Sequence, residues 1–188
     1  MISATVKSAQ SACPDSRTLL ELAREGDCEA FGEICREQEA PLFRQAMALC
    51  GNAALAEDLT QETLVAAWKS LRRYDGRCKL FTWLCAILLN QYRNSLRKKL
   101  PLALDPDANE PIDSLNPPDQ ALLASEQAAT VQARIAALSP KHRQVIFLRF
   151  YLENSLDEIA AALGCSVGTV KSRLFHALQN LRKMNLHP

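Results

Sequence analysis

The stretch from Ser155 to Leu174 reads SLDEIAAALGCSVGTVKSRL, and it decides the fold of the C-terminal part of the chain. Ser155 and Glu158 stand three residues apart before an apolar run, which is the spacing of a capping box at a helix start. Gly164 is predicted to end that short helix, and a longer helix should follow from about Val167 to Lys183. A short helix, a tight turn and a longer basic helix form the helix-turn-helix pattern, which places its second helix in the major groove of DNA.

The second helix of this pattern carries side chains that suit DNA. Its apolar positions recur at three and four residues, so one face locks onto the preceding helix and the other stays outside. Lysine and arginine attract phosphates, whereas serine and histidine can reach base edges. No acidic residue follows Glu158, so little repels a phosphate backbone. The candidate contacts are Thr169, Lys171, Ser172, Arg173, Phe175 and His176; a merely solvated helical hairpin is the alternative.

The remaining sequence also predicts helices, because alanine, leucine, glutamate, glutamine and arginine dominate and no period-two pattern occurs. Helices are expected at about 16–26, 29–49 with a bend at Pro41, 54–71, 81–99, 119–137 and from Pro140 onward. Five prolines lie among acids and no base between residues 101 and 118, which predicts an extended linker. The expected fold is all-α: a tail at 1–14, a helical domain at 15–100, the linker at 101–118 and a second domain, with the helix-turn-helix, at 119–188.

Charge is segregated in the first domain. Asp58, Gln61 and Glu62 share one helix face, which suits a basic or amide-rich partner helix unless it is only a solvated face. Eight basic residues and one acid follow between Arg72 and Lys99. Cations for phosphates and aromatic walls for unstacked bases are what strand opening requires. The candidate residues for it are Arg72, Arg73, Tyr74, Arg77, Lys79, Phe81, Arg93 and Arg97.

Several function classes find no support in the sequence. It has no glycine-rich phosphate loop, no HExxH and no GxSxG, so no catalytic residue, cofactor, metal ligand or small-molecule substrate is expected. The seven cysteines form no CxxC or CxxH pair and predict small buried side chains in a reducing compartment; a redox or metal sensor is the alternative. No apolar run approaches the length of a membrane span or a signal peptide, so a cytoplasmic protein is expected.

Two sets of motifs resemble conserved regions of bacterial sigma factors, and most of all those of the extracytoplasmic-function (ECF) subgroup. The first set, which resembles the second conserved region, comprises Gly26-Asp27, Ala30-Phe31, Ala56 to Thr63, Trp68, Phe81 to Leu84, Asn90 and Arg97. The second set, which resembles the fourth conserved region, comprises Leu138 to Arg143, Ser155 to Ala160 and Gly168 to Leu174. Together they cover nearly all of residues 19–100 and 120–183 in the expected order.

The resemblance implies an alternative sigma factor that gives RNA polymerase its promoter specificity. The face with Asp58 would bind core polymerase, the basic block with Asn90 would read and open the −10 promoter element, and the helix from Val167 would read the −35 element. Trp83 falls in a packing motif and is assigned to the core. The resemblance also implies an anti-sigma factor as the inhibitor, and a membrane-bound anti-sigma factor is one of the alternatives.

The base preference at the −10 and −35 elements does not carry over from the family, because this sequence departs from the family pattern at five positions: Arg77, Lys79, Leu80, Asn94 and His176. A stand-alone helix-turn-helix regulator and a sigma-like decoy are the other interpretations.

Overall fold

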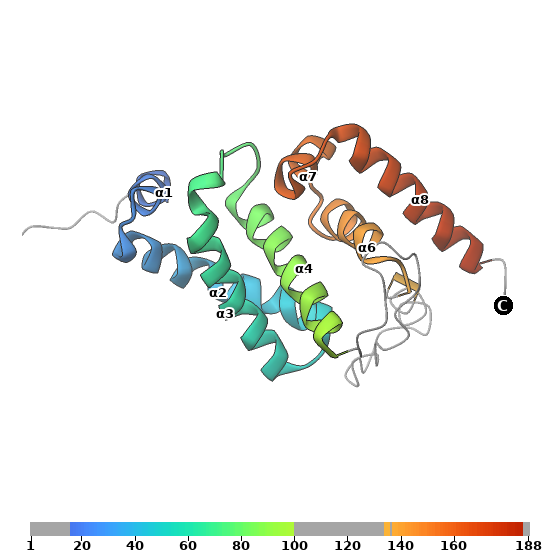
Figure 1. The fold of residues 1–188 in the computed structure, drawn as a ribbon, viewed down its shortest axis with the longest axis horizontal. Coiled ribbons are helices and arrows are strands. Elements are labelled where there is room, and N and C mark those ends of the chain that lie inside the picture. Colours follow the sequence, from blue (N-terminus) through green and yellow to red (C-terminus); the bar gives the residue numbers. More distant parts are fainter. Residues whose placement is uncertain (1–15, 100–133, 136, 186–188) are drawn as a thin grey trace, which may run out of the picture.

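The structure is a computed structural model that describes residues 16–99, 134–135 and 137–185. These residues form helices and no strand, which confirms the all-α prediction (Figure 1). The predicted tail, the predicted linker and most of the helix predicted at 119–137 lie outside the described residues. Among the described residues, no helix is long and apolar enough to cross a membrane.

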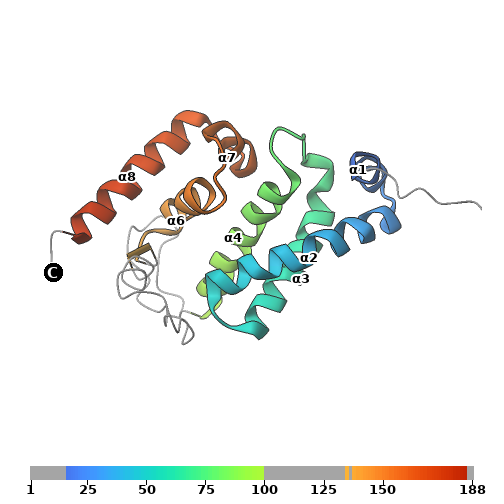
Figure 2. The same cartoon turned by 180° about the vertical axis from the view of Figure 1, so that it is seen from behind.

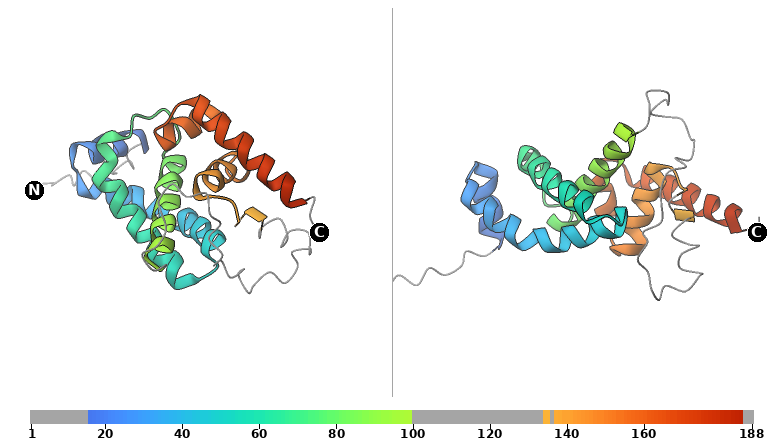
Figure 3. Two further views of the ribbon diagram at one scale, coloured as in Figure 1. Left: turned by 45° about the vertical axis from the view of Figure 1, so that its right-hand side comes forward. Right: turned by 90° about the horizontal axis from the view of Figure 1, so that it is seen from below.

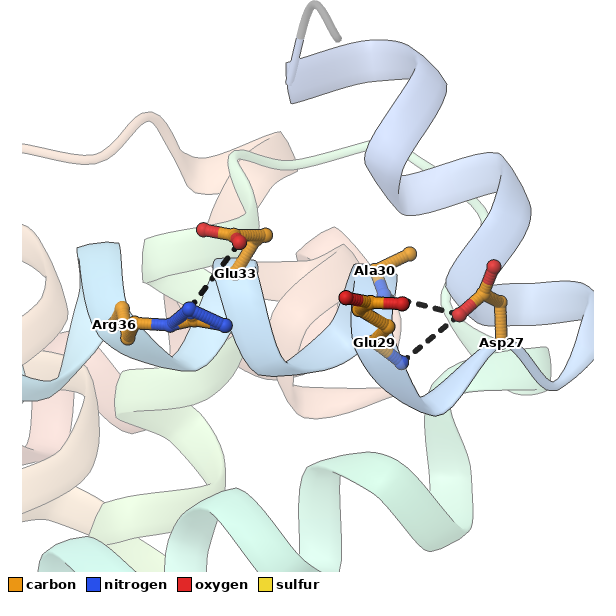
Figure 4. Close-up of polar contacts among 5 residues, drawn as sticks. All are labelled: Asp27, Glu29, Ala30, Glu33 and Arg36. Carbon is orange, nitrogen blue, oxygen red and sulfur yellow. Dashed lines mark hydrogen bonds and ion pairs between the residues drawn. The ribbon is translucent and has the colours of Figure 1, made fainter. Parts of the chain in front are cut away.

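The N-terminal group consists of α1 (Ser16–Glu25), α2 (Cys28–Cys50), α3 (Ala53–Ser70), the short 3-10 helix η1 (Leu71–Arg73) and α4 (Leu80–Lys99). Side chains define the helix starts. The carboxylate of Asp27 accepts hydrogen bonds from the backbone N–H groups of Glu29 and Ala30 at 2.9 and 3.1 Å (Figure 4). Asn52 caps α3 in the same way through the N–H of Leu55. Each cap satisfies backbone donors that a helix start leaves free.

Helix α2 passes through Pro41 without a break. A proline inside a helix removes one backbone hydrogen bond and favours a kink. Here α2 packs against α1, α3 and α4, and the neighbouring Leu42 and Ala46 are completely buried. Tertiary packing on several sides therefore maintains a helix that the proline alone would weaken.

The C-terminal group consists of α6 (Pro140–Ile146), the π-helical turn η2 (Phe147–Tyr151), α7 (Leu156–Leu163) and α8 (Val167–Asn185). The predicted capping box is present, because Ser155 and Glu158 exchange side-chain and backbone hydrogen bonds at 2.8 and 3.2 Å. Gly164 ends α7 at a φ of 62°, a conformation in which a Cβ would be strained. Helix α6 begins at Pro140 as predicted, and the side chain of Ser139 before it makes no capping hydrogen bond.

The two groups are in direct contact. Helix α4 contacts α6, η2 and α7. The ribbon views show α4 beside α6 and α7 (Figures 1, 2 and 3). One continuous buried cluster joins them and includes the completely buried side chains of Leu88, Leu148 and Val145. A smaller cluster with Leu19 and Ile34 packs α1 on α2 and η1. The sequence predicts two tethered bodies, and their direct packing is a finding of the structure alone.

The prediction that the cysteines are buried side chains is right for two of the described cysteines and wrong for the others. Cys78 and Cys85 are buried, but Cys35, Cys50 and Cys165 are half-buried and Cys28 is exposed. Cys28 is the first residue of α2, and its side chain is exposed although Ala30 in the same turn is buried. Cys78 lies in the loop before α4, so it does not share a helix face with Cys85. Cys13 lies outside the described residues.

Candidate functional site

The acidic ridge is the exposed face of α3 that carries Asp58, Gln61 and Glu62, and the structure brings all three side chains to the surface together. The amide of Gln61 donates a 3.0 Å hydrogen bond to the carboxylate of Glu39 on α2, which extends the ridge across two helices. Val65, one turn further along α3, exposes 52% of its surface. A carboxylate face that also exposes a large apolar side chain fits a protein partner better than a purely solvated helix.

Sequence reasoning missed both Glu39 and Val65. Glu39 lies 22 residues from Gln61, so only the packing of α2 on α3 brings them together. Val65 continues the spacing of Asp58 and Glu62 along the helix, and that spacing could have identified it.

The basic loop is the segment 72–79 between α3 and α4. Arg72, Arg73, Arg77 and Lys79 are all exposed there. Asp75 accepts hydrogen bonds from both the backbone N–H and the guanidinium of Arg77. The backbone hydrogen bond is the largest of the causes that lower the pKa of Asp75, and the hydrogen bond from the Arg77 guanidinium comes next. The single acid of this loop is thus held as a carboxylate, paired with one of the four cations, and the loop keeps a net positive surface.

Tyr74 does not offer the stacking surface that the sequence suggested. Its side chain is 5% exposed, and its ring lies 5.2 Å from that of Trp83. The hydroxyl donates a hydrogen bond to the backbone carbonyl of Cys78, and burial is the main cause that raises the pKa of Tyr74. Tyr74 therefore packs under the loop and links its two ends through the hydrogen bond to Cys78. Trp83 is half-buried and packs against both apolar clusters of the N-terminal group, as expected of a core residue.

The other predicted residues for strand opening lie along α4 and are differently accessible. Asn90 and Arg97 are exposed, whereas Phe81 and Arg93 are half-buried. The amide oxygen of Asn90 accepts a 2.8 Å hydrogen bond from the amide of Gln144 in α6. The C-terminal group lies against part of α4, so Arg93 is less accessible than Asn90 and Arg97.

The reading face is the outer face of α8. Lys171, Ser172, Phe175 and His176 are exposed on it, and Thr169 and Arg173 are half-buried at its edge. The Thr169 hydroxyl lies 2.9 Å from that of Ser166, whose oxygen also accepts from the Thr169 backbone N–H at 3.1 Å. Ser166 thereby fixes the start of α8. The Phe175 ring is 58% exposed, which leaves an apolar surface for contact with a thymine methyl group.

His142 is a neighbour of the reading face that the sequence did not reveal. Its ring stacks on that of His176 with the centroids 6.3 Å apart. Burial is the main cause that lowers the pKa of His142, and the charges of His176 and Arg173 add to it. His142 is therefore a largely neutral ring that supports His176 from α6 at physiological pH.

The described residues thus present three surfaces: the acidic ridge, the basic loop with α4, and the reading face. Within 16–99, 134–135 and 137–185, no group of three histidine, cysteine, aspartate or glutamate side chains could hold a metal ion. The cationic surfaces can attract phosphates, and their neutral side chains can read bases. The arrangement supports binding by complementary charge and shape.

Comparison with known proteins gives matches over most of the chain. The family described as Sigma-70 region 2 matches residues 36–100, and Sigma-70, region 4 matches residues 134–183. The ECF RNA polymerase sigma factor SigW of Bacillus subtilis is 30% identical over 87% of this chain and 93% of its own length. SigL of Mycobacterium tuberculosis, also described as an ECF RNA polymerase sigma factor, is 36% identical over 78% of this chain and 83% of its own length. The structure of CnrH in complex with the cytosolic domain of CnrY aligns with a TM-score of 0.57 at 25% identity, covering 90% of this chain and 97% of that chain.

Proposed function

We propose a promoter-reading mechanism for this chain, which belongs to the extracytoplasmic-function (ECF) family of RNA polymerase sigma factors. It binds core RNA polymerase and directs transcription to specific promoters. The chain contributes binding energy and promoter recognition, while the polymerase performs the covalent chemistry. The observation that carries the proposal is the reading face, where exposed cationic and polar side chains stand on a helix fixed by Ser166 behind a capped turn.

Polymerase docking is assigned to the acidic ridge. Asp58 and Glu62 provide the charge, Gln61 provides an amide already oriented by Glu39, and Val65 provides an apolar contact. A basic or amide-rich helix of the polymerase would complement these groups. A stand-alone regulator would have no use for this surface, which favours the sigma-factor mechanism over that alternative.

The −10 element is assigned to the basic loop and α4. Arg72, Arg73 and Arg77 would hold phosphates while the duplex opens, and Asn90 and Phe81 would receive unstacked bases.

The −35 element is assigned to the reading face. There Lys171 and Arg173 would bind phosphates, Ser172 and His176 would read base edges, and Phe175 would contact a methyl group.

An anti-sigma factor is the proposed inhibitor, and the cytoplasm is the proposed compartment. The CnrH complex supports the first point, because that similar fold was solved with a bound cytosolic protein domain. Such a partner would cover the acidic ridge or the cationic surfaces and so exclude polymerase or DNA.

Run-off transcription tests this function directly. The purified chain is mixed with bacterial core polymerase and a fragmented genomic library, and the start sites of the transcripts are sequenced. We expect transcripts from a defined set of sites that share two sequence elements, and none with core polymerase alone. DNA binding without any polymerase-dependent transcript would instead indicate a stand-alone regulator.

A further inference from the structure

Two histidine rings meet where α6 packs against α8. His142 of α6 and His176 of α8 are inclined by 28° to each other, with ring centroids 6.3 Å apart. The ring of Phe175 meets His176 edge-on at 5.6 Å. Centroid separations in this range are typical of aromatic rings that pack together. His176 is therefore an exposed side chain of the reading face whose orientation two neighbouring rings restrict.

The two histidines differ in how their surroundings accommodate a proton. His142 is half-buried, and its Nδ1 atom is buried with no hydrogen-bond partner among the described residues. A proton on that nitrogen would be a buried donor without an acceptor, which is costly. Burial is also the main cause that lowers the pKa of His142. Water can solvate a charged ring at the exposed His176, so a proton taken up by the pair should reside there.

The charged side chains of the two helices that carry the pair are all basic, because neither helix contains an acidic residue. These side chains are Lys141 and Arg143 on α6 and Lys171, Arg173, Arg182 and Lys183 on α8. Arg134, next to a residue that packs against α8, is basic as well. No carboxylate of α6 or α8 is therefore present to stabilise a charged imidazole on the reading face.

Helix α7 also packs against α8 and carries two acids, Asp157 and Glu158, in its first turn. The carboxylate of Glu158 accepts a hydrogen bond from the backbone N–H of Ser155, and the charge of Lys79 also acts on it. Neither acid is among the causes that shift the pKa of His142. The start of α7 therefore does not supply a counter-charge to the histidine pair.

DNA would bring the negative charge that this surface lacks. A nearby opposite charge favours the charged form of a titratable group. Histidine ordinarily titrates at about pH 6.5, so a modest stabilisation by phosphates is enough to add a proton near neutral pH. A charged imidazole donates hydrogen bonds from both nitrogens, whereas a neutral one donates from one. Proton uptake would thus give His176 both a charge and a second donor toward DNA.

We propose that His176 takes up one proton when the reading face binds the −35 element, and that His142 is the positioning residue that directs this proton to His176. His142 acts as a neutral ring: it orients His176 and places no competing charge beside it. Affinity for the −35 element then rises as the pH falls. The inference rests on the proposed function, because it requires the reading face to bind DNA.

The pH dependence of promoter binding tests the role of His176. The binding constant of the holoenzyme for a labelled promoter fragment is measured at constant salt from about pH 6 to about pH 8, with the natural chain and with His176→Gln. Glutamine keeps a donor and an acceptor but takes up no proton. Titrations of the polymerase itself cancel in the ratio of the two binding constants. If DNA stabilises the charged imidazole about tenfold, this ratio should fall about threefold from about pH 6.5 to about pH 7.5.

Two substitutions of His142 test its positioning role. His142→Phe keeps a flat neutral ring beside His176 and should preserve the pH dependence. His142→Lys places a fixed charge there, which opposes a second charge, and should abolish the pH dependence over the same range. A purely structural role would instead change the affinity by a constant factor at every pH, so identical pH profiles for the two variants would overturn the role of His142.

Nuclear magnetic resonance of the imidazole groups gives the same answer if the lysine variant does not fold. The chain has three histidines, and their signals are assigned by comparison with His142→Phe and His176→Gln. We expect a −35 duplex, added near neutral pH, to shift the His176 signal toward that of a charged ring. The His142 signal should stay that of a neutral ring. A charged His142, or an unshifted His176 in the bound chain, would contradict the proposal.

The experiment separates the inference from the function on which it rests. If the natural holoenzyme binds no promoter fragment at any pH, the proposed function fails and the inference fails with it. If the natural holoenzyme binds, but its pH dependence equals that of His176→Gln, the function stands and the inference alone is refuted.

Discussion

Replacement of Lys171 by alanine tests whether the reading face binds DNA phosphates. Lys171 is exposed on α8, and among the described residues it forms no ion pair, so its charge is available to a phosphate. Each phosphate contact contributes about 0.9 to the slope of log K against log salt concentration. Lys171→Ala should therefore flatten that slope by about 0.9. Across a fourfold change in salt, the affinity ratio of natural chain to variant should change by about 3.5-fold.

The assay measures the equilibrium binding constant of the holoenzyme for a labelled promoter fragment at several salt concentrations, from about 50 to about 200 mM. Ser172→Ala is the matched control, because it removes a neutral hydroxyl from the next position on the same exposed face. That variant should lower affinity with an unchanged slope. An unchanged slope in Lys171→Ala would refute the phosphate contact, whatever happens to the affinity.

Three further predictions concern other parts of the chain. Asp58→Lys with Glu62→Lys should abolish co-purification with core polymerase while the circular dichroism spectrum stays helical; retained binding would contradict the docking assignment. Ser155→Ala removes the capping box of α7 and should cost about 1 kcal/mol of unfolding free energy, measured by urea denaturation, whereas Ser139→Ala, which removes no capping hydrogen bond, should cost clearly less. Burial raises the pKa of the Cys85 thiol to about 12. Since the folded state then holds a proton that the unfolded state loses above pH 9, unfolding free energy should fall by up to about 1.4 kcal/mol per pH unit between pH 9 and 12, and Cys85→Ala should show a shallower fall.

Local signals in the sequence predicted the helices and their ends well. Ser155 with Glu158 predicted the start of α7, Gly164 predicted its end, and Pro140 predicted the start of α6. These signals act through hydrogen bonds and backbone angles within one turn, so the sequence contains them directly. Pro41 is the exception, because packing around α2 outweighs its local preference.

Contacts between distant residues could not be predicted in the same way. The burial of Tyr74 depends on Trp83 and on a carbonyl presented by the fold of the loop. The pairing of Gln61 with Glu39 depends on how α2 crosses α3. Residue types identify side chains that can bind DNA or protein, but only the tertiary structure determines which of them are exposed.

The contact between α4 and the C-terminal group depends mainly on apolar packing. Two side-chain hydrogen bonds across it contribute about 1–3 kcal/mol in total, and each buried unpaired polar group costs a similar amount. The polar groups therefore nearly cancel in free energy, and the net stability of the contact must come from the shared apolar cluster around Leu88 and Leu148.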